Sequence, residues 1–164
     1  MRIISGKHKG KILSAPKKLP VRPTTDMAKE ALFNILESRY YLDTKKVLDL
    51  FSGTGNIAFE FASRGCENIT AIDKNFHCNQ FIMQTADDLE FNINVKKMDC
   101  LDFLEKTKSD FDIIFCVITN TSLFFRFILL VFNPLFIISG ILSPDFISGI
   151  PIIGINVSLF IFIH

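Results

Sequence analysis

A glycine-rich turn followed by a carboxylate is the part of this sequence best suited to chemistry. Gly53-Thr54-Gly55-Asn56-Ile57-Ala58 fits the pattern G-x-G-x-x-[GA] between an expected strand and an expected helix. Such glycines let the backbone turn tightly, so that a nucleotide-like ligand can approach the helix N-terminus. Asp73 ends the next expected strand, 18 residues beyond Gly55, where a carboxylate can accept hydrogen bonds from ribose hydroxyls. The alternative is an ordinary glycine-rich turn with a capping Asp.

Charge decides which nucleoside suits this turn. Asp49 precedes the turn, and a dinucleotide would place a dianionic pyrophosphate near it; two anions ~5 Å apart in a cleft of lowered dielectric repel by several kcal/mol. S-adenosylmethionine has no phosphate and carries an ammonium and a sulfonium group, which Asp49 would attract while Asp73 holds the ribose. Asp99, after the third expected strand, would lie beside the adenine or cap the following helix. The expected cofactor is S-adenosylmethionine, bound by Asp49, Ser52, Gly53, Thr54, Gly55, Asp73 and Asp99.

Alternating strands and helices must position this turn. Apolar runs of strand length lie at 47–51, 68–73, 95–99 and 111–115. Helical patterns follow Thr25 or Asp26, with an apolar stripe from Ala28 to Leu36, and recur at 56–64, 74–90 and 101–106. This alternation implies βαβ crossovers. We expect an α/β fold with a Rossmann-like, doubly wound parallel sheet.

The first 25 residues carry seven basic side chains and no acidic one, a local charge of +7 that favours a polyanionic partner. Two short apolar runs separated by Gly6 and Gly10 predict a small hairpin with Lys side chains at its bend. Lys and Arg contact phosphates without reading bases. We therefore divide the chain into a basic extension (1–25), a nucleoside-binding domain (26–115) and an apolar tail (116–164). A solvated charged tail is the alternative for the first segment.

The sequence resembles the RsmD family of 16S ribosomal RNA guanine-N2 methyltransferases from residue 1 to about 115. The segments that carry the resemblance are 2–10, Arg22-Pro23-Thr24-Thr25-Asp26, Glu30-Ala31-Leu32-Phe33-Asn34-Ile35-Leu36 and Leu48-Asp49-Leu50-Phe51-Ser52-Gly53-Thr54-Gly55. The resemblance implies a class I methyltransferase fold, S-adenosylmethionine as cofactor, and 16S ribosomal RNA or the small ribosomal subunit as partner. It also implies that Arg22 to Asp26 line the cleft between the basic segment and the cofactor. The expected RNA contacts are Arg2, Lys7, Lys9, Lys11, Arg22 and Thr24.

One segment departs from this family. Enzymes of this type carry Asp/Asn-Pro-Pro-Tyr/Phe after the fourth strand, where polar oxygens orient the target amine and the aromatic ring stacks on the base. Here 111–115 is followed by Cys116-Val117-Ile118-Thr119-Asn120, and Asn133-Pro134-Leu135-Phe136 comes too late to be a good substitute. We assign no catalytic residue and expect impaired methyl transfer. A non-catalytic RNA-binding or membrane-associated remnant is the alternative.

The tail has an unusual composition, with two charged residues in 116–164, eight Phe and no Ala, Lys or Glu. A reading-frame shift near codon 115 in A/T-rich DNA is the interpretation we favour. A membrane segment at 123–142 is the second, although Asn133-Pro134 at its centre weakens it. Divergent strands at 135–142 and 157–163 are the third. Composition does not separate the first from the third.

Other features narrow the class of protein. The four cysteines form no CxxC pair and have no flanking His at ligand spacing, so we expect buried thiols and no metal site. The charged N-terminus lacks the apolar run of a signal peptide. We expect a cytoplasmic monomer.

Overall fold

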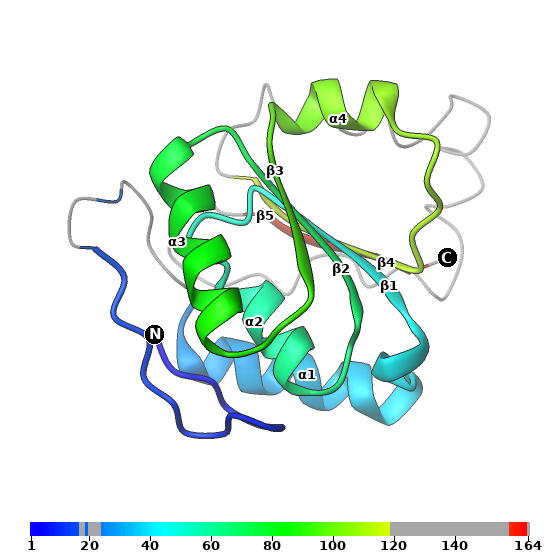
Figure 1. Cartoon of the computed structure of the whole chain (residues 1–164). Helices are drawn as coiled ribbons and strands as arrows, with labels where there is room; N and C mark the ends of the chain where they lie inside the picture. Colours follow the sequence, from blue (N-terminus) through cyan, green and yellow to red (C-terminus); the bar gives the residue numbers. More distant parts are fainter. Residues whose placement is uncertain (17–18, 20–23, 119–157, 164) are drawn as a thin grey trace.

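The computed structural model describes residues 1–16, 19, 24–118 and 158–163, and the strands of this part form a five-stranded sheet (Figure 1). The strands are β1 (Lys46–Leu50), β2 (Asn68–Asp73), β3 (Ile93–Lys97), β4 (Ile113–Ile118) and β5 (Ser158–Ile163), in the order β3-β2-β1-β4-β5. The first four are parallel, and β5 is antiparallel to β4. The expected α/β fold with a Rossmann-like parallel sheet is confirmed.

The strand order reverses at β1, which lies in the middle of the sheet. Leu50 at the end of β1 pairs with Ile72 of β2 on one side and with Cys116 of β4 on the other. The chain therefore moves outward from β1 to β2 and β3 and then returns to the opposite side of β1. Open α/β sheets bind ligands beyond the carboxyl ends of the strands at such a reversal. This geometry puts the glycine-rich turn at the expected place for a ligand.

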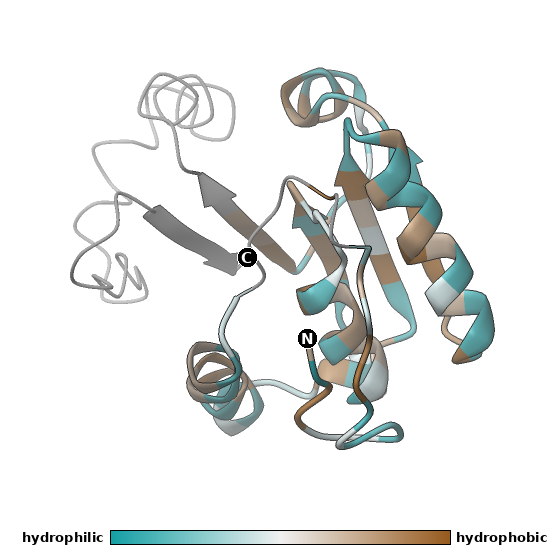
Figure 2. Cartoon of the chain, turned by 90° about the vertical axis from the view of Figure 1, so that its left-hand side faces the viewer, coloured by the Kyte–Doolittle hydropathy of each residue, from teal (hydrophilic) through white to brown (hydrophobic). Residues whose placement is uncertain are grey.

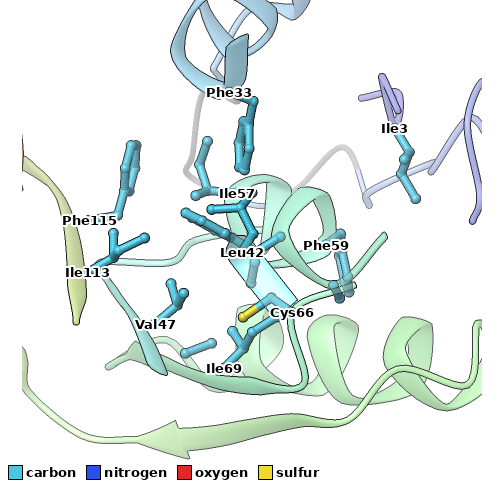
Figure 3. Close-up of a cluster of buried hydrophobic side chains, with 14 of the residues drawn as sticks. Ile3, Phe33, Leu42, Val47, Ile57, Phe59, Cys66, Ile69, Ile113 and Phe115 are labelled. Atoms are coloured by element: carbon cyan, nitrogen blue, oxygen red, sulfur yellow. The ribbon is translucent and has the colours of Figure 1, made fainter. Parts of the chain in front are cut away.

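Helices cover both faces of the sheet. The helices α1 (Asp26–Arg39), α2 (Asn56–Ser63) and α3 (Phe76–Asp88) share a buried cluster with one face, including Val47, Ile69 and Ile113 (Figure 3). The helix α4 (Cys100–Lys106) shares the other cluster with Leu48, Leu50 and Ile72. Brown, hydrophobic bands recur along the strands and helices that build these clusters (Figure 2). The alternation along β1 turns Asp49 toward the face that α2 covers.

Polar side chains fix where the helices begin. Thr25 caps α1, because its Oγ1 accepts a hydrogen bond from the Ala28 amide at 3.3 Å. Asn75 caps α3 in the same way through Oδ1, which accepts from the amides of His77 and Cys78. A short 3₁₀ helix, η1 (Leu42–Thr44), connects α1 to β1. The predicted cap at Thr25 or Asp26 is thus Thr25.

The N-terminal residues form the expected hairpin. Arg2 and Ile12 make an antiparallel bridge, and Gly6 and Gly10 have φ angles of 81° and 83° at the bend. The bend lies against the end of α2, so a Cβ atom on Gly6 would stand 1.8 Å from the Ser63 carbonyl oxygen. The hairpin is therefore packed onto the nucleoside-binding domain (Figure 1).

Two strands are displaced by two or more residues from their expected bounds, and β1 is displaced by one residue. β3 occupies 93–97 instead of 95–99, because Met98 turns its amide to the Asp73 carbonyl oxygen at 3.2 Å and Asp99 caps α4. β4 occupies 113–118 instead of 111–115, since its apolar run continues into Cys116-Val117-Ile118. Periodicity places strands well, but the contacts that end them are made with distant parts of the chain.

The described part of the tail contains a strand, not a helix. β5 (Ser158–Ile163) pairs along β4, which agrees with the strand interpretation for 157–163. The segments 123–142, Asn133–Phe136 and 135–142 lie outside the described residues. Among the described helices, none is long and apolar enough to cross a membrane. The four cysteines are buried and free, as expected.

Candidate nucleoside-binding site

The chain leaves β1 through a turn whose backbone is left-handed at several positions. Phe51, Gly53 and Gly55 have φ angles of 57°, 53° and 73°. At Gly55, space also requires glycine, because a Cβ atom would lie 2.8 Å from Ile82 Cγ1 of α3. The Gly55 amide donates to the Ser52 carbonyl oxygen at 2.7 Å. The turn 51–55 is therefore a defined backbone shape that leads directly into α2.

Asp73 is hydrogen-bonded to this turn, and its expected contact with a ribose stays a prediction. Its Oδ2 accepts a hydrogen bond from the Gly53 amide at 2.8 Å, and its Oδ1 accepts from the Asn75 amide at 2.8 Å. Each carboxylate oxygen has two lone pairs, so each keeps one for a ligand hydroxyl. The half-buried Asp73 carboxylate can thus order the turn and accept from a ribose at the same time.

Asp49 lies beneath the turn and is buried, with 1% of its surface exposed. Its Oδ2 accepts a hydrogen bond from the Ala58 amide in the first turn of α2 at 3.2 Å. Burial raises the pKa of the Asp49 carboxyl to about 8, the Ala58 amide opposes this shift, and the nearby Asp73 adds to it. A cationic ligand group close to Asp49 would therefore favour its ionised form and release a proton.

The raised pKa of Asp49 predicts how stability depends on pH. Between pH 4 and 8 the unfolded chain has lost this proton and the folded chain retains it, so the free energy of unfolding falls as pH rises and this decline ends above about pH 8. Asp49→Asn keeps an oxygen for the Ala58 amide but cannot ionise, and we expect a shallower decline from pH 5 to 8. Urea unfolding across this range measures the difference; parallel profiles for the two proteins would contradict the assignment.

Asp99 adopts its helix-capping role. Its Oδ1 accepts a hydrogen bond from the Leu101 amide at 2.9 Å, and α4 begins at Cys100. The Cys100 thiol in turn accepts from the Phe51 amide at 3.3 Å and so joins α4 to the turn. Burial raises the pKa of this thiol to about 12, which keeps it protonated and unreactive. The role of Asp99 beside an adenine remains a prediction.

Three further polar side chains surround the turn. Thr54 is buried, and its Oγ1 lies 3.5 Å from the sulfur of Met1. Asn79 of α3 donates to the carbonyl oxygens of Asp73 and Asn75 at 2.8 and 2.7 Å, which fixes the backbone that carries the Asp73 carboxylate. Within the described part of the chain, Asn79 Oδ1 and Ser52 Oγ are buried without a hydrogen-bond partner. Orphaned polar atoms beside a glycine turn fit a site that accepts a polar ligand.

Sequence reasoning missed Asn79, although its spacing gave a signal. It stands six residues after Asp73, in the first turn of the helix that follows. A buried amide at that position can reach back to the preceding loop.

Four of the six expected RNA-contacting residues, Arg2, Lys7, Lys9 and Lys11, belong to the hairpin. Arg2 lies near the start of α2 and its Nε is 3.1 Å from Asp26 Oδ2, in an exposed ion pair. Lys7 lies at the bend and pairs with Glu90 just beyond α3, also at 3.1 Å. Because α2 has eight residues, these two ends of the hairpin are separated by about 12 Å of helix. Lys9 and Lys11 are exposed, Thr24 is half-buried, and Arg22 lies outside the described residues.

A buried ionic network holds the hairpin against α1 and α2. Lys29 Nζ donates to Glu60 Oε2 at 3.1 Å, to the Arg2 carbonyl oxygen at 2.6 Å and to Asn56 Oδ1 at 2.9 Å. These three acceptors account for all three ammonium protons. Burial lowers the pKa of Lys29 below its ordinary value, and Glu60 partly offsets this effect.

Glu60 likewise accepts hydrogen bonds through both of its carboxylate oxygens. Its Oε2 also accepts from the Ile4 amide at 2.9 Å, while Oε1 accepts from the Ser5 amide at 3.0 Å and from Arg64 Nε at 2.8 Å. Arg64 extends the network to Glu37 on α1 at 2.6 Å. Sequence reasoning misses Lys29 and Glu60, although opposite charges inside two apolar helix stripes are a signal of a buried pair.

Comparison with known proteins decides the family. The model of the family described as conserved hypothetical protein 95 matches residues 1–117. The chain belongs to this family. Ribosomal RNA small subunit methyltransferase D of Haemophilus influenzae is 34% identical over 121 residues, and the Escherichia coli K12 protein of the same name is 30% identical over 116 residues. The resemblance to the RsmD family is thus confirmed.

The RsmD relatives are longer than this chain. The matches cover 70% of the chain but 61% of the H. influenzae protein and 58% of the E. coli protein. Among solved structures, the E. coli methyltransferase-like protein yhhF has a TM-score of 0.62 and 27% identity, covering 70% of this chain and 60% of its own. A Thermus thermophilus protein has a TM-score of 0.58 at 27% identity, covering 65% and 60%. The shared part is the fold that carries the glycine turn.

Proposed function

We propose that this chain binds S-adenosylmethionine at the turn 51–55 and 16S ribosomal RNA through its hairpin, and that its methyl transfer to guanine N2 is impaired. The observation that carries the proposal is the bond between the Gly53 amide and the Asp73 carboxylate, because it places an anionic acceptor at the mouth of a glycine turn. Membership of the RsmD family supports the same cofactor and substrate class.

The residues present suit a cationic nucleoside. S-adenosylmethionine supplies a methyl group on a sulfonium, which is an electrophile. Asp73 would accept hydrogen bonds from the ribose, and Asp49 would attract the methionine ammonium from beneath the turn. The amides at the start of α2 and the orphaned Ser52 Oγ and Asn79 Oδ1 provide further polar partners. A phosphate-bearing ligand would meet the Asp73 carboxylate and the Asp49 carboxyl group at this turn, and either group repels a phosphate when it is ionised.

The impairment follows from what ends β4. In the sequence, 111–115 is followed by Cys116-Val117-Ile118-Thr119-Asn120 and not by Asp/Asn-Pro-Pro-Tyr/Phe. The motif that would orient the amine lone pair toward the methyl group is therefore missing from this position of the sequence. Loss of such positioning costs orders of magnitude in rate.

Two measurements test the function. Calorimetry should show binding of S-adenosylmethionine or S-adenosylhomocysteine to the purified chain, and no affinity for either would overturn the cofactor proposal. Incubation with tritiated S-adenosylmethionine and unmethylated small ribosomal subunits should transfer methyl groups at least about 10³-fold more slowly than the E. coli relative does. Guanine methylation at a comparable rate would overturn the impairment.

Partner and location are part of the same proposal. The small-subunit names of the relatives support ribosomal RNA as the partner, and we propose a monomer in the cytoplasm. The RNA-binding alternative without cofactor would give salt-dependent binding to ribosomal RNA but no calorimetric response to S-adenosylhomocysteine.

A further inference from the structure

Asn56 joins the cofactor turn to two proposed RNA contacts, to Thr24 directly and to Arg2 through Lys29. It follows Gly55 directly as the first residue of α2, and it is buried. Its Oδ1 accepts from Lys29 Nζ at 2.9 Å, and its Nδ2 donates to the Thr24 carbonyl oxygen at 3.0 Å. Both partners lie outside the turn, at or just before the start of α1, so this one amide links α2 to a part of the chain that is distant in sequence.

The second link runs through Lys29 to the hairpin. Lys29 Nζ, while donating to Asn56, also donates to the Arg2 carbonyl oxygen at 2.6 Å. Thr24 and Arg2 are thus both held by their main-chain oxygens. The Arg2 side chain is 54% exposed and pairs with Asp26. The backbones of Arg2 and Thr24 are therefore joined to Asn56 through no more than two hydrogen bonds.

The helix itself gives Asn56 no reason to be polar. Gly55 caps α2 without a side-chain hydrogen bond, and the next three residues, 57–59, are buried and apolar. An amide carries an acceptor and a donor on two separate atoms, so it can accept from an ammonium on one side and donate to a carbonyl on the other, which an apolar group cannot do. The two functions of the Asn56 side chain match its two partners.

We propose that Asn56 is a positioning residue that couples occupancy of the cofactor turn to RNA binding by Arg2 and Thr24. This inference rests on the proposed function. A ligand that shifts the turn also shifts the start of α2, and Asn56 transmits that shift to Arg2 and Thr24. By linkage, RNA must then strengthen cofactor binding by the same factor.

The test uses Asn56→Asp, which retains an acceptor for Lys29 but cannot donate to Thr24. Affinity of the full chain for a 16S ribosomal RNA transcript is measured with and without saturating S-adenosylhomocysteine at fixed salt. In the original chain we expect S-adenosylhomocysteine to tighten RNA binding by about 5-fold or more. Asn56→Asp should reduce this factor below about 2-fold while the affinity for S-adenosylhomocysteine alone changes much less.

A matched control is Asn34→Asp, the same chemical change at an exposed position of α1, which should leave the coupling factor unchanged. Asn56→Ser, whose hydroxyl is too short to reach both partners, serves as a second variant if Asn56→Asp does not fold. Coupling that is absent from the original chain, or that survives both substitutions, overturns the inference while cofactor binding stands. No binding of S-adenosylhomocysteine overturns the inference and the proposed function together.

Discussion

Glu60→Gln is expected to destabilise the chain by about 3–5 kcal/mol, because it removes the only carboxylate that contacts both buried cations of the described network. The Glu60 side chain is fully buried, and the Lys29 and Arg64 side chains are 1% and 3% exposed. A neutral amide would leave two positive charges facing each other without their shared counter-ion. Small domains are stable by about 5–15 kcal/mol, so this loss is a large part of the total.

Lys29→Met should cost less than Glu60→Gln. It leaves Glu60 paired with Arg64 and with the amides of Ile4 and Ser5, so one buried ion pair survives. It does leave two acceptors without their donor, the part-buried Arg2 carbonyl oxygen, which water can reach, and the buried Asn56 Oδ1, whose loss of a donor costs about 1–3 kcal/mol. The order of the two effects tests the arrangement of charges, since a generic packing defect would not predict it.

Glu37→Gln provides the control for both variants. It makes the same chemical change at the outer end of the network, where the Glu37 side chain is 45% exposed and pairs with Arg64. An exposed pair contributes about 1 kcal/mol or less. Urea unfolding followed by far-ultraviolet circular dichroism gives all three values. A Glu60→Gln loss as small as that of Glu37→Gln would show that the buried network does not hold the hairpin in place.

The strongly patterned parts of the fold could be predicted from the sequence because their causes are local. Val47-Leu48-Asp49-Leu50 is apolar enough to be a buried strand, and Gly53 and Gly55 mark the turn after it. The sequence also indicates that Asp73 lies close to Gly53, because the carboxyl ends of adjacent parallel strands meet at one edge of the sheet, and the two residues are hydrogen-bonded there. These features depend on residues within one βαβ unit.

The features that sequence reasoning missed depend on contacts between units. Lys29 and Glu60 are 31 positions apart, and only the packing of α1 on α2 shows that each satisfies the other. The basic segment is a similar case: its charge suggests an RNA-binding arm, yet Ile4 and Ser5 donate their amides to a buried carboxylate. Charge counts describe the partner that a surface favours, whereas hydrogen-bond satisfaction decides whether the segment is docked.

At the site, too, local patterns indicate where a side chain points, whereas contacts between elements decide how deeply it is buried. Asp49 was expected to face the methionine end of the cofactor, and the structure places it under the turn with a hydrogen bond to α2. Period-two alternation along β1 gives that direction, but the depth of burial, which controls its pKa, depends on how α2 covers the strand. The carboxylate that remains half-exposed at the turn is Asp73.

Asp73→Asn should weaken binding of S-adenosylhomocysteine by about 10–100-fold, a loss of about 1.4–2.8 kcal/mol. The two carboxylate oxygens accept from the amides of Gly53 and Asn75. An asparagine can present an oxygen to one of these amides, but its NH₂ group must then face the other, where two donors repel. The substitution therefore disturbs the turn and removes an acceptor for the ribose hydroxyls.

Asp102→Asn makes the same chemical change at an exposed position of α4 and should leave the affinity unchanged. Calorimetry gives the dissociation constants, and unfolding in urea shows whether the variants keep their fold. Because the lost interactions lie at the turn, the expected effect on affinity exceeds the effect on stability. An Asp73→Asn protein that binds S-adenosylhomocysteine as tightly as the original chain would place the nucleoside away from this carboxylate, and the glycine turn would then be a structural element only.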